Sequence, residues 1–203
     1  MRGIMFANEI KQLNESLVND PEWHKLNNPN SRWSKDRLFS SYHGLGNKQK
    51  GVLGEYFTEK YMRDTRGSVV EPPKHSDHDR IIDGYKTEIK FSLAVSDSKK
   101  DVIVCDKFMI NHVACKKDWD RLIFVGINPD PSWTNVQTKK DTLHSRIRAY
   151  YMNKEDFVNH LEKDGTTVFK HQQSGEKAEN DDYMCTNFSA FIELDFVKEI
   201  SEW

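Results

Sequence analysis

The stretch DHDRIIDGYKTEIKFS, residues 77–92, has the pattern of two short strands joined by a tight turn. At its centre is Asp83-Gly84, a pair that favours a two-residue hairpin because both central positions of a type I′ turn need positive φ. If these residues form the loop, Ile82 pairs with Tyr85 and the register of the hairpin follows by counting. The sequence therefore predicts both the hairpin and the pairing of its strands.

This register gathers two acids and a lysine. Asp79 falls directly opposite Glu88, and opposed residues have Cβ atoms about 4.5–5.5 Å apart on one face of a sheet. Lys90 shares that face because strand side chains alternate with a period of two. For the same reason, Ile89 and Phe91 are expected to point the other way, toward a core.

Two carboxylates at this separation repel one another and favour a cation between them. Mg²⁺ prefers oxygen ligands, is typically held by one or two carboxylates, and keeps several waters. Such an ion can polarise a phosphoryl oxygen, while a nearby lysine orients water or offsets developing charge. The pattern thus points to phosphodiester hydrolysis. The alternative is that Asp79, Glu88 and Lys90 are simply the solvated face of an amphipathic hairpin.

The sequence on both sides of the hairpin predicts further helix and strand. Residues 48–63 place apolar side chains along one helical side, with Asn47 as a candidate N-cap and Glu55 beside the apolar side. Residues 68–71 form a plausible short strand before two prolines. The apolar run 122–127 has the pattern of a strand buried on both faces.

Shorter patterns predict the remaining elements. They are a helix through Phe6, Ile10, Leu13 and Leu17, a loop-rich connection over 21–46, strand over 101–113 with a helix over 107–116 as the alternative, a helix opened by Asn153 and Asp156 and stopped at Gly165, strands over 166–170 and 184–194, and a polar loop over 171–182. The sequence contains no internal repeat.

Length and composition indicate one globular domain. The chain has 203 residues, of which 36% are apolar and 31% charged, and its mean hydropathy is -0.79. No run approaches the roughly 20 apolar residues of a membrane span, and the N-terminus is too charged for a secretory signal. We therefore expect a cytoplasmic protein that does not associate with membranes. Three cysteines without C-x-x-C spacing argue against a disulfide framework and a thiolate zinc site.

The overall charge argues against a general nucleic-acid coat, because the net charge is -2 and the pI is near 6.4. Charge is nevertheless unevenly distributed along the chain. In residues 139–154, five lysine and arginine side chains stand against the single acid Asp141. A localised basic cleft is compatible with this composition.

Asp79, followed across the hairpin by Glu88-Ile89-Lys90, resembles the active site of the PD-(D/E)xK nucleases, the restriction-endonuclease-like superfamily. One departure is His78, which stands where the motif name has proline, a position at which the superfamily is itself loose.

The flanking segments are similar to that superfamily as well. KGVLGEYFTEKYM (50–62) looks like its first core helix, in which a glutamate, here Glu55, faces the active site. FMINHVACKKDWDRLIFVGINPD (108–130) looks like its later core strands.

The resemblance covers about 47–130 and implies a single α/β domain over 1–203. Its restriction endonuclease-like core would be a mixed central β-sheet flanked by helices. The N-terminal helical segment (1–46) and the C-terminal α/β segment (131–203) would then serve DNA recognition or dimerisation.

The same resemblance implies a role for each residue of the motif. Asp79 and Glu88 would bind Mg²⁺ with help from the carbonyl of Ile89, and Lys90 would position or activate the attacking water. Glu55 would orient a metal-bound water or support a second ion. The implied activity is that of a type II restriction endonuclease, a homodimer that cuts double-stranded DNA at a short specific sequence and leaves 5′-phosphate and 3′-hydroxyl ends.

Two other functions stay open at this point. One is a DNA repair or Holliday-junction-type nuclease of the same fold, which recognises the structure of its DNA. The other is a DNA-binding module without catalysis. Asp77 and Asp83 are competing acids, but Asp77 lies further from the turn and Asp83 is explained by the turn itself. For His75 and His78 we expect structural or solvent-facing roles, because no second cluster completes a zinc site.

Several side chains outside the motif are candidates for DNA contact, because basic and amide groups bind phosphates and base edges. They are Asn111, His112, Lys139, Lys140, Arg146, Arg148, Gln172 and Gln173. For the basic members, a solvated charged face is an equal alternative. The acids of the loop 171–182 would repel phosphate.

Overall fold

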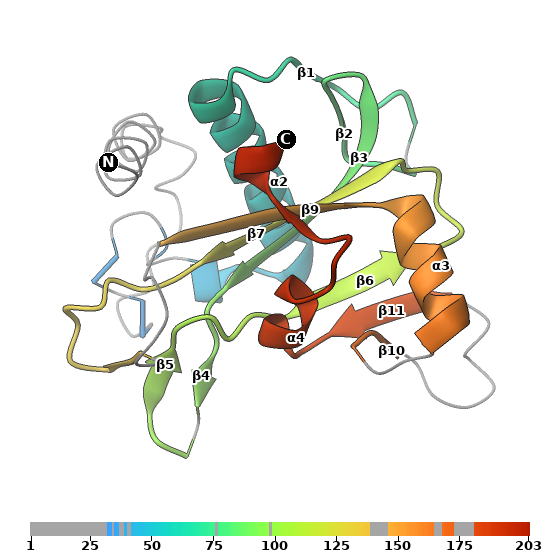
Figure 1. Cartoon of the computed structure of the whole chain (residues 1–203). Coiled ribbons are helices and arrows are strands. Elements are labelled where there is room, and N and C mark those ends of the chain that lie inside the picture. Colours follow the sequence, from blue (N-terminus) through green and yellow to red (C-terminus); the bar gives the residue numbers. More distant parts are fainter. Residues whose placement is uncertain are drawn as a thin grey trace.

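The structure is a computed structural model of the chain, shown in Figure 1. The residues that it describes are 32, 33, 35, 36, 39, 42–75, 77–97, 99–138, 146–164, 168–172 and 181–203. The predicted helix through Phe6, Ile10, Leu13 and Leu17 lies outside these residues. Within the described ranges, no helix combines the length and the apolar composition needed to cross a membrane.

A six-stranded mixed sheet forms the centre of the fold, in the order β1-β2-β3-β7-β9-β12. Its strands are β1 (Val70–Glu71), β2 (Arg80–Ile82), β3 (Tyr85–Leu93), β7 (Arg121–Ile127), β9 (Ile147–Asn153) and β12 (Lys198–Glu199). Strands β3 and β7 are parallel, and all other neighbours are antiparallel. The prediction of a mixed central sheet in an α/β fold is therefore confirmed.

The predicted hairpin is formed by β2 and β3. Asp83 and Gly84 have φ angles of 50° and 85°, the positive values that a type I′ turn requires. Ile82 pairs with Tyr85, and the paired register continues as predicted to the first residue of β2. The local turn chemistry thus sets the register of this region of the sheet.

The predicted helix after residue 47 is α2 (Asn47–Arg66). Its N-cap is Gly46, so the prediction that Asn47 caps the helix was wrong by one position. The backbone N–H of Gly46 donates to the side chain of Gln49, which explains why the helix begins one residue earlier. The helix ends at Gly67, whose φ of 71° suits a glycine C-cap.

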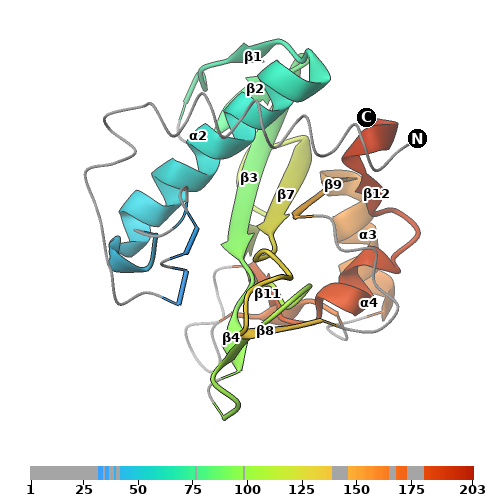
Figure 2. The same ribbon diagram turned by 90° about the vertical axis from the view of Figure 1, so that its left-hand side faces the viewer.

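Two further helices are α3 (Lys154–Asp164) and α4 (Phe188–Ile192). Figure 2 shows α2 on one face of the sheet and α3 and α4 on the other. On the first face, the rings of Phe57 and Phe91 lie 5.6 Å apart, and on the second, the rings of Phe124 and Phe188 lie 5.5 Å apart. The sheet is therefore covered by helices on both faces, as predicted.

Strand β7 is the central buried strand that the apolar run predicted. Leu122, Ile123, Phe124 and Val125 are all completely buried. It pairs with β3 on one side and with β9 on the other. Strand β9 was not predicted from the sequence, because its tyrosines and arginine suggested a basic surface segment.

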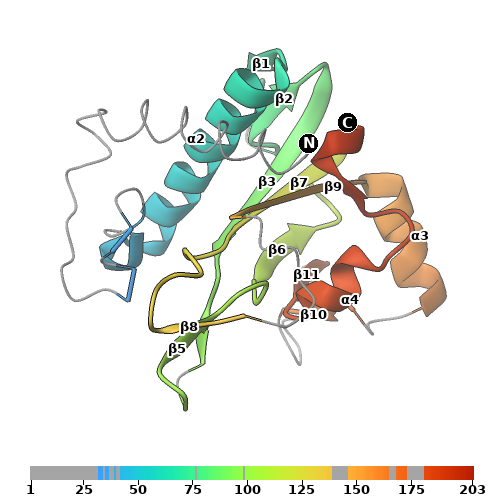
Figure 3. The same ribbon diagram turned by 60° about the vertical axis from the view of Figure 1, so that its left-hand side comes forward.

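Two small sheets extend the fold (Figure 3). One is formed by β10 (Lys170–His171), β11 (Asp182–Cys185) and β6 (Ile110–Ala114), and the other by β4 (Ser96–Asp97), β5 (Val102–Val104) and β8 (Val136–Gln137). Two short 3₁₀ helices are Tyr42–Gly44 and Ile200–Glu202. The preference for strand over 101–113 is confirmed by β5 and β6.

The C-terminal predictions were partly wrong. Residues 184–194 were predicted as one strand, but β11 ends at Cys185 and α4 follows. Asn187 starts this helix, because its side chain accepts a hydrogen bond from the backbone N–H of Ala190. The predicted helix after Asn153 is confirmed by α3.

The contact between α2 and β3 predicts the effect of two glycine substitutions. A Cβ atom at Gly54 would lie 2.4 Å from the Cβ of Phe91, whereas a Cβ at Gly51, one turn earlier, would meet nothing within 4 Å. We expect Gly54→Ala to destabilise the fold by about 1–3 kcal/mol. Gly51→Ala should stabilise it by about 0.5–1 kcal/mol, because alanine favours the helix. Urea unfolding of both variants measures this, and equal effects would contradict the proposed close contact.

The turn residue Asp83 predicts a pH effect on stability. Burial opposes its ionisation, but hydrogen bonds from the backbone N–H of Val69 and the indole of Trp203, both 2.8 Å long, outweigh burial and lower the pKa of Asp83. A lowered folded-state pKa stabilises the fold above the unfolded-state pKa of about 3.9, and this contribution is lost as the pH falls toward the folded-state value.

Asp83→Asn keeps a residue that tolerates positive φ and removes the charge. We expect this substitution to lower the free energy of unfolding by about 1 kcal/mol at neutral pH. The effect is this small because Asp83 is exposed to solvent. The stability difference from the wild type should shrink as the pH falls below about 5. Thermal unfolding across pH 3–7 measures the difference, and a difference that stays constant over this range would refute the role of the carboxylate.

Candidate active site

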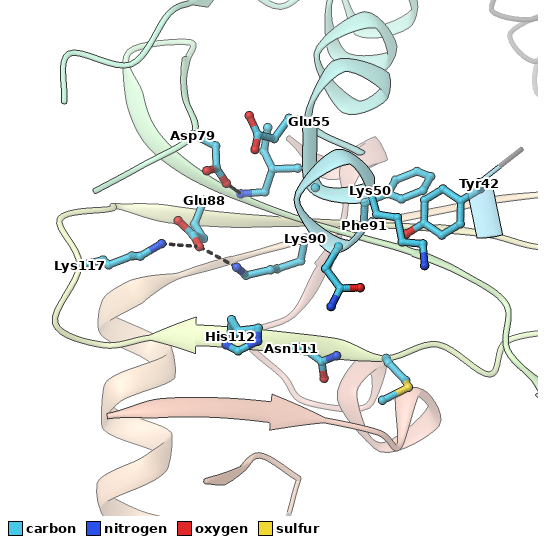
Figure 4. A pocket seen from close by; sticks show the side chains of 14 residues that line it. Tyr42, Lys50, Glu55, Asp79, Glu88, Lys90, Phe91, Asn111, His112 and Lys117 are labelled. Atoms are coloured by element: carbon cyan, nitrogen blue, oxygen red, sulfur yellow. Dashed lines mark hydrogen bonds and ion pairs between the residues drawn. The ribbon is translucent and has the colours of Figure 1, made fainter. Parts of the chain in front are cut away.

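An open pocket of about 400 Å³ lies along one edge of β3. Strand β2 pairs with β3 only as far as Thr87, and beyond this residue the described part of the chain places no neighbouring strand on that edge of β3. The pocket uses this edge, and the start of α2 and strand β6 supply its other walls (Figure 4). Its lining includes all the predicted motif residues, which are Glu55, Asp79, Glu88, Ile89 and Lys90.

Asp79 occupies the position where β2 separates from β3. Its backbone N–H donates to the carbonyl of Thr87 at 3.0 Å, and its Oδ2 accepts a 2.7 Å hydrogen bond from the backbone N–H of Ile89. The carboxylate of Asp79 therefore accepts the hydrogen bond that the backbone of a further strand residue would otherwise accept from β3. Because the N–H and C=O of a strand residue point to the same edge, the carbonyl of Ile89 is directed toward the pocket edge as well.

Glu88 is the most buried acid of the pocket, with 1% of its surface exposed. Its Oε1 accepts hydrogen bonds from the ammonium groups of Lys90 at 2.7 Å and Lys117 at 3.4 Å. Its Oε2 is buried and has no hydrogen-bond partner among the described residues. Oε1 therefore has two ammonium partners, whereas Oε2 has none among the described residues and could bind a ligand.

Glu55 is held beside the pocket by Arg80. The Nη1 atom of Arg80 lies 3.2 Å from Glu55 and donates a 2.6 Å hydrogen bond to the carbonyl of Asp79, while its Nε binds Glu59 at 2.9 Å. Helix α2 and the start of β2 are therefore linked by one guanidinium group. This link keeps Glu55 and Asp79 on the same side of the pocket.

The acids of the pocket are difficult to ionise together. Burial, followed by the neighbouring Glu88 carboxylate, raises the pKa of Asp79, and the Ile89 N–H and two lysines only partly offset this. Burial and the charge of Asp79 also raise the pKa of Glu55, against the effect of Arg80. Both shifts have the same physical cause, which is negative charge concentrated where water is scarce. A cation between the carboxylates would relieve it.

The pocket residues fit a magnesium ion. Asp79 and Glu88 offer carboxylate oxygens, one of them the buried unpaired Oε2, and Ile89 offers a carbonyl at the same edge. Within the described ranges, no three His, Cys, Asp or Glu side chains lie close enough to hold an ion unaided. Mg²⁺ does not need such a cluster, because it keeps several waters and is often bound through one or two carboxylates and substrate phosphate.

The opposite wall of the pocket contains Asn111 and His112 from β6 (Figure 4). His112 has a φ of 57°, and its backbone N–H donates to Oε1 of Gln172 at 2.8 Å. The side-chain NH₂ of Gln172 then donates to Nε2 of His112 at 2.9 Å, so the ring proton is on Nδ1, which donates to Asp182 at 2.8 Å. These bonds orient the imidazole. The buried Oδ1 of Asn111 has no partner among the described residues.

The pocket residues that were not predicted as site residues include Tyr42, Lys50 and Lys117. Burial raises the pKa of Tyr42 to about 12, so its hydroxyl stays protonated. Lys50 lies 5.7 Å from the centre of the Tyr42 ring. Parallel pairing of residues 85–93 with 121–127 places the starts of the two strands side by side. Had this pairing been predicted, Lys117, which closely precedes the second strand, would have been placed near Glu88.

The three candidate DNA-contact residues outside β6 that the structure describes, Arg146, Arg148 and Gln172, do not line this pocket. Arg146 forms an ion pair with Asp36, and Arg148 lies 3.5 Å from Asp106 with its guanidinium against Tyr150. Gln172 contacts His112 through the hydrogen bonds that orient its ring. Lys139, Lys140 and Gln173 lie outside the described residues.

The two histidines before the motif, His75 and His78, lie in contact with each other. His78 is buried, with 2% of its surface exposed, and its ring packs edge-on against His75 at 4.7 Å. His75 is exposed, and its Nε2 lies 3.4 Å from Oδ2 of Asp118. Neither lines the pocket.

Comparisons of the chain with protein-family models, curated proteins and solved structures found no match. The resemblance to the PD-(D/E)xK nucleases therefore rests on the sequence motif alone.

Proposed function

We propose that this protein is a Mg²⁺-dependent endonuclease that hydrolyses phosphodiester bonds of double-stranded DNA. The observation that carries the proposal is the convergence of Asp79, Glu88 and Lys90 at one free strand edge, with the Oε2 atom of Glu88 buried and unpaired. A purely solvated charged face would not bury Glu88 to 1% exposure. Burying one acid beside a second acid costs free energy, and a cation bound between the two carboxylates would offset this cost.

In this mechanism, Asp79, Glu88 and the carbonyl of Ile89 would hold the ion. When bound, Mg²⁺ supplies Lewis acidity toward the phosphate and lowers the pKa of water. Lys90, whose ammonium group lies 2.7 Å from Glu88, would orient the attacking water and activate it by stabilising the hydroxide that forms. The water releases a proton to solvent and adds to phosphorus, the bond from phosphorus to the 3′-oxygen breaks, and the 3′-oxygen takes up a proton from solvent, which gives 5′-phosphate and 3′-hydroxyl ends. Glu55, held by Arg80, orients a second water at the rim or supports a second ion.

The charge of the chain favours specific recognition of DNA over general binding. The net charge is -2, so affinity must come from a few placed contacts and not from an overall basic field. We therefore propose a type II restriction-like enzyme that recognises a short sequence and acts as a homodimer on two strands. A structure-specific repair or junction nuclease is the second candidate, because the same pocket would cut branched DNA. A non-catalytic DNA-binding module is the third.

Magnesium binding predicts a stability change that needs no DNA. Mg²⁺ should raise the melting temperature of the wild type, because an ion that binds only the folded state stabilises it by about 2.7 kcal/mol at 100 times its Kd. The double variant Asp79→Asn/Glu88→Gln should lose this response, because amides are poor ligands for the ion. Differential scanning fluorimetry at constant ionic strength measures the shift. An equal shift in both proteins would mean that the ion binds elsewhere.

The catalytic role of Lys90 predicts a loss of cleavage. Incubation of the wild type with Mg²⁺ and a sequenced plasmid should yield discrete fragments with 5′-phosphate ends. Lys90→Ala should reduce the rate by about 10²–10⁴-fold, because it removes general acid–base and electrostatic assistance. Lys107→Ala, an exposed lysine outside the pocket, is the matched control and should cut normally.

Three results would change the proposal. Cleavage of branched or mismatched DNA alone would favour the repair or junction nuclease. Binding of DNA without any Mg²⁺-dependent cleavage would favour the non-catalytic module. Full activity of Lys90→Ala would remove the proposed active site.

A further inference from the structure

The carboxylate of Glu88 is bound by two lysines that come from different regions of the fold. Lys90 is on β3 itself, two residues away, and its side chain is 15% exposed. Lys117 belongs to the turn between β6 and β7, and its side chain is 42% exposed. Both ammonium groups approach the same oxygen, Oε1, at 2.7 and 3.4 Å. Lys117 also partly offsets the negative charge of the neighbouring Asp79.

The backbone that carries Lys117 is firmly anchored. Lys154 at the start of α3 donates a 2.6 Å hydrogen bond from Nζ to the carbonyl of Lys117. Trp119, which is 2% exposed, donates from its indole to the carbonyl of Ala114 at 2.9 Å. The ammonium group of Lys154 also lies 5.6 Å from the Trp119 ring centre. The turn therefore holds the Lys117 backbone still, while its long exposed side chain can change partner.

Binding of a metal ion would alter the charge around Glu88 and so favour a change of partner for Lys117. A divalent ion on the free Oε2 of Glu88 would bring two positive charges within a few ångströms of both lysines and repel them. Lys90 is enclosed by the pocket, but Lys117 has a solvent-exposed stem and can turn away at little cost. The pocket that it borders is where the phosphodiester group would lie under the proposed function.

We propose that Lys117 is a substrate-binding residue that exchanges Glu88 for a non-bridging oxygen of the DNA phosphate. This inference rests on the proposed function and adds a residue outside the three-residue motif. In the absence of substrate, Lys117 competes with the metal ion for Glu88. Once metal and DNA are bound, its ammonium group contacts the phosphate backbone and positions it for attack, without reading the base sequence.

Lys116 is a matched control one residue away. Its ammonium group lies 3.2 Å from Asp181, and its side chain is 71% exposed. It does not line the pocket. Lys116 has the same charge as Lys117 and is adjacent to it in sequence. A difference between the two variants therefore reflects the position of the ammonium group and not the net charge.

The first experiment measures DNA affinity against salt, in a Lys90→Ala background that prevents cleavage. The probe is a short fluorescent duplex that spans a cleavage site mapped with the wild type. Added Lys117→Ala or Lys117→Gln should weaken binding about tenfold and reduce the magnitude of the slope of log K against log salt by about 0.9, the value for one lost phosphate contact. Added Lys116→Ala should leave the slope unchanged, and added Lys117→Arg should restore it.

The second experiment measures magnesium binding without DNA. Because a competing ammonium group is removed, Lys117→Ala should lower the Mg²⁺ concentration at the midpoint of the thermal stabilisation curve, and Lys116→Ala should not. A purely structural role for Lys117 predicts a lower melting temperature without magnesium and no change in this midpoint. The two Lys117 variants without a charge differ in shape, so agreement between them excludes a packing defect as the cause.

The outcomes separate this inference from the proposed function. If the wild type cuts DNA and the Lys117 variants keep the parent salt slope, the inference is overturned and the proposed function stands. An unchanged or increased magnesium midpoint in Lys117→Ala also overturns it. If the wild type neither binds nor cuts any duplex, the proposed function fails, and the inference fails with it.

Discussion

The hydrogen bond from the backbone N–H of Ile89 to the carboxylate of Asp79 is the interaction on which the candidate site depends. Strand β2 leaves β3 at this point, and an unpaired strand edge within a fold is costly unless another group satisfies it. The side chain of Asp79 does so over 2.7 Å. It thereby ends the pairing of the hairpin and opens the edge that becomes the pocket. An amide at this position could not both accept this bond and carry the negative charge that a metal ion requires.

The second constraint is the close approach of α2 to β3. Gly54 lies against Phe91 so closely that no side chain fits between them, and this distance sets how far the helix stands from the sheet. The same helix turns carry Lys50 and Glu55 into the pocket wall. Arg80 then joins Glu55 to the backbone of Asp79. The packing of α2 against β3 and the bonds made by Arg80 therefore both fix the positions of the site residues.

The charges of the pocket are balanced within a small volume. Glu55, Asp79 and Glu88 face the cations of Lys50, Lys90 and Lys117. Burial and neighbouring negative charge raise the pKa values of Asp79 and Glu55, and Lys90 and Lys117 partly offset the shift of Asp79, as Arg80 does that of Glu55. Under the proposed function, such a site would accept both a divalent cation and an anionic phosphate, because each new charge would find partners that are already present.

The sequence by itself determined the hairpin, its register, the face that carries Glu88 and Lys90, and the buried strand β7, because each depends on short-range turn chemistry or on the alternation of a single strand. Only the tertiary structure decided that β9 lies beside β7, that residues 188–192 are helical, that Lys117 contacts Glu88, and that Asp182 binds the ring of His112. The strand neighbours and the pocket contacts depend on segments that are distant in sequence, and the free energy that selects them comes from packing the whole core. The helix over 188–192 has a local N-cap in Asn187, but the apolar residues of this short segment are compatible with strand as well as with helix.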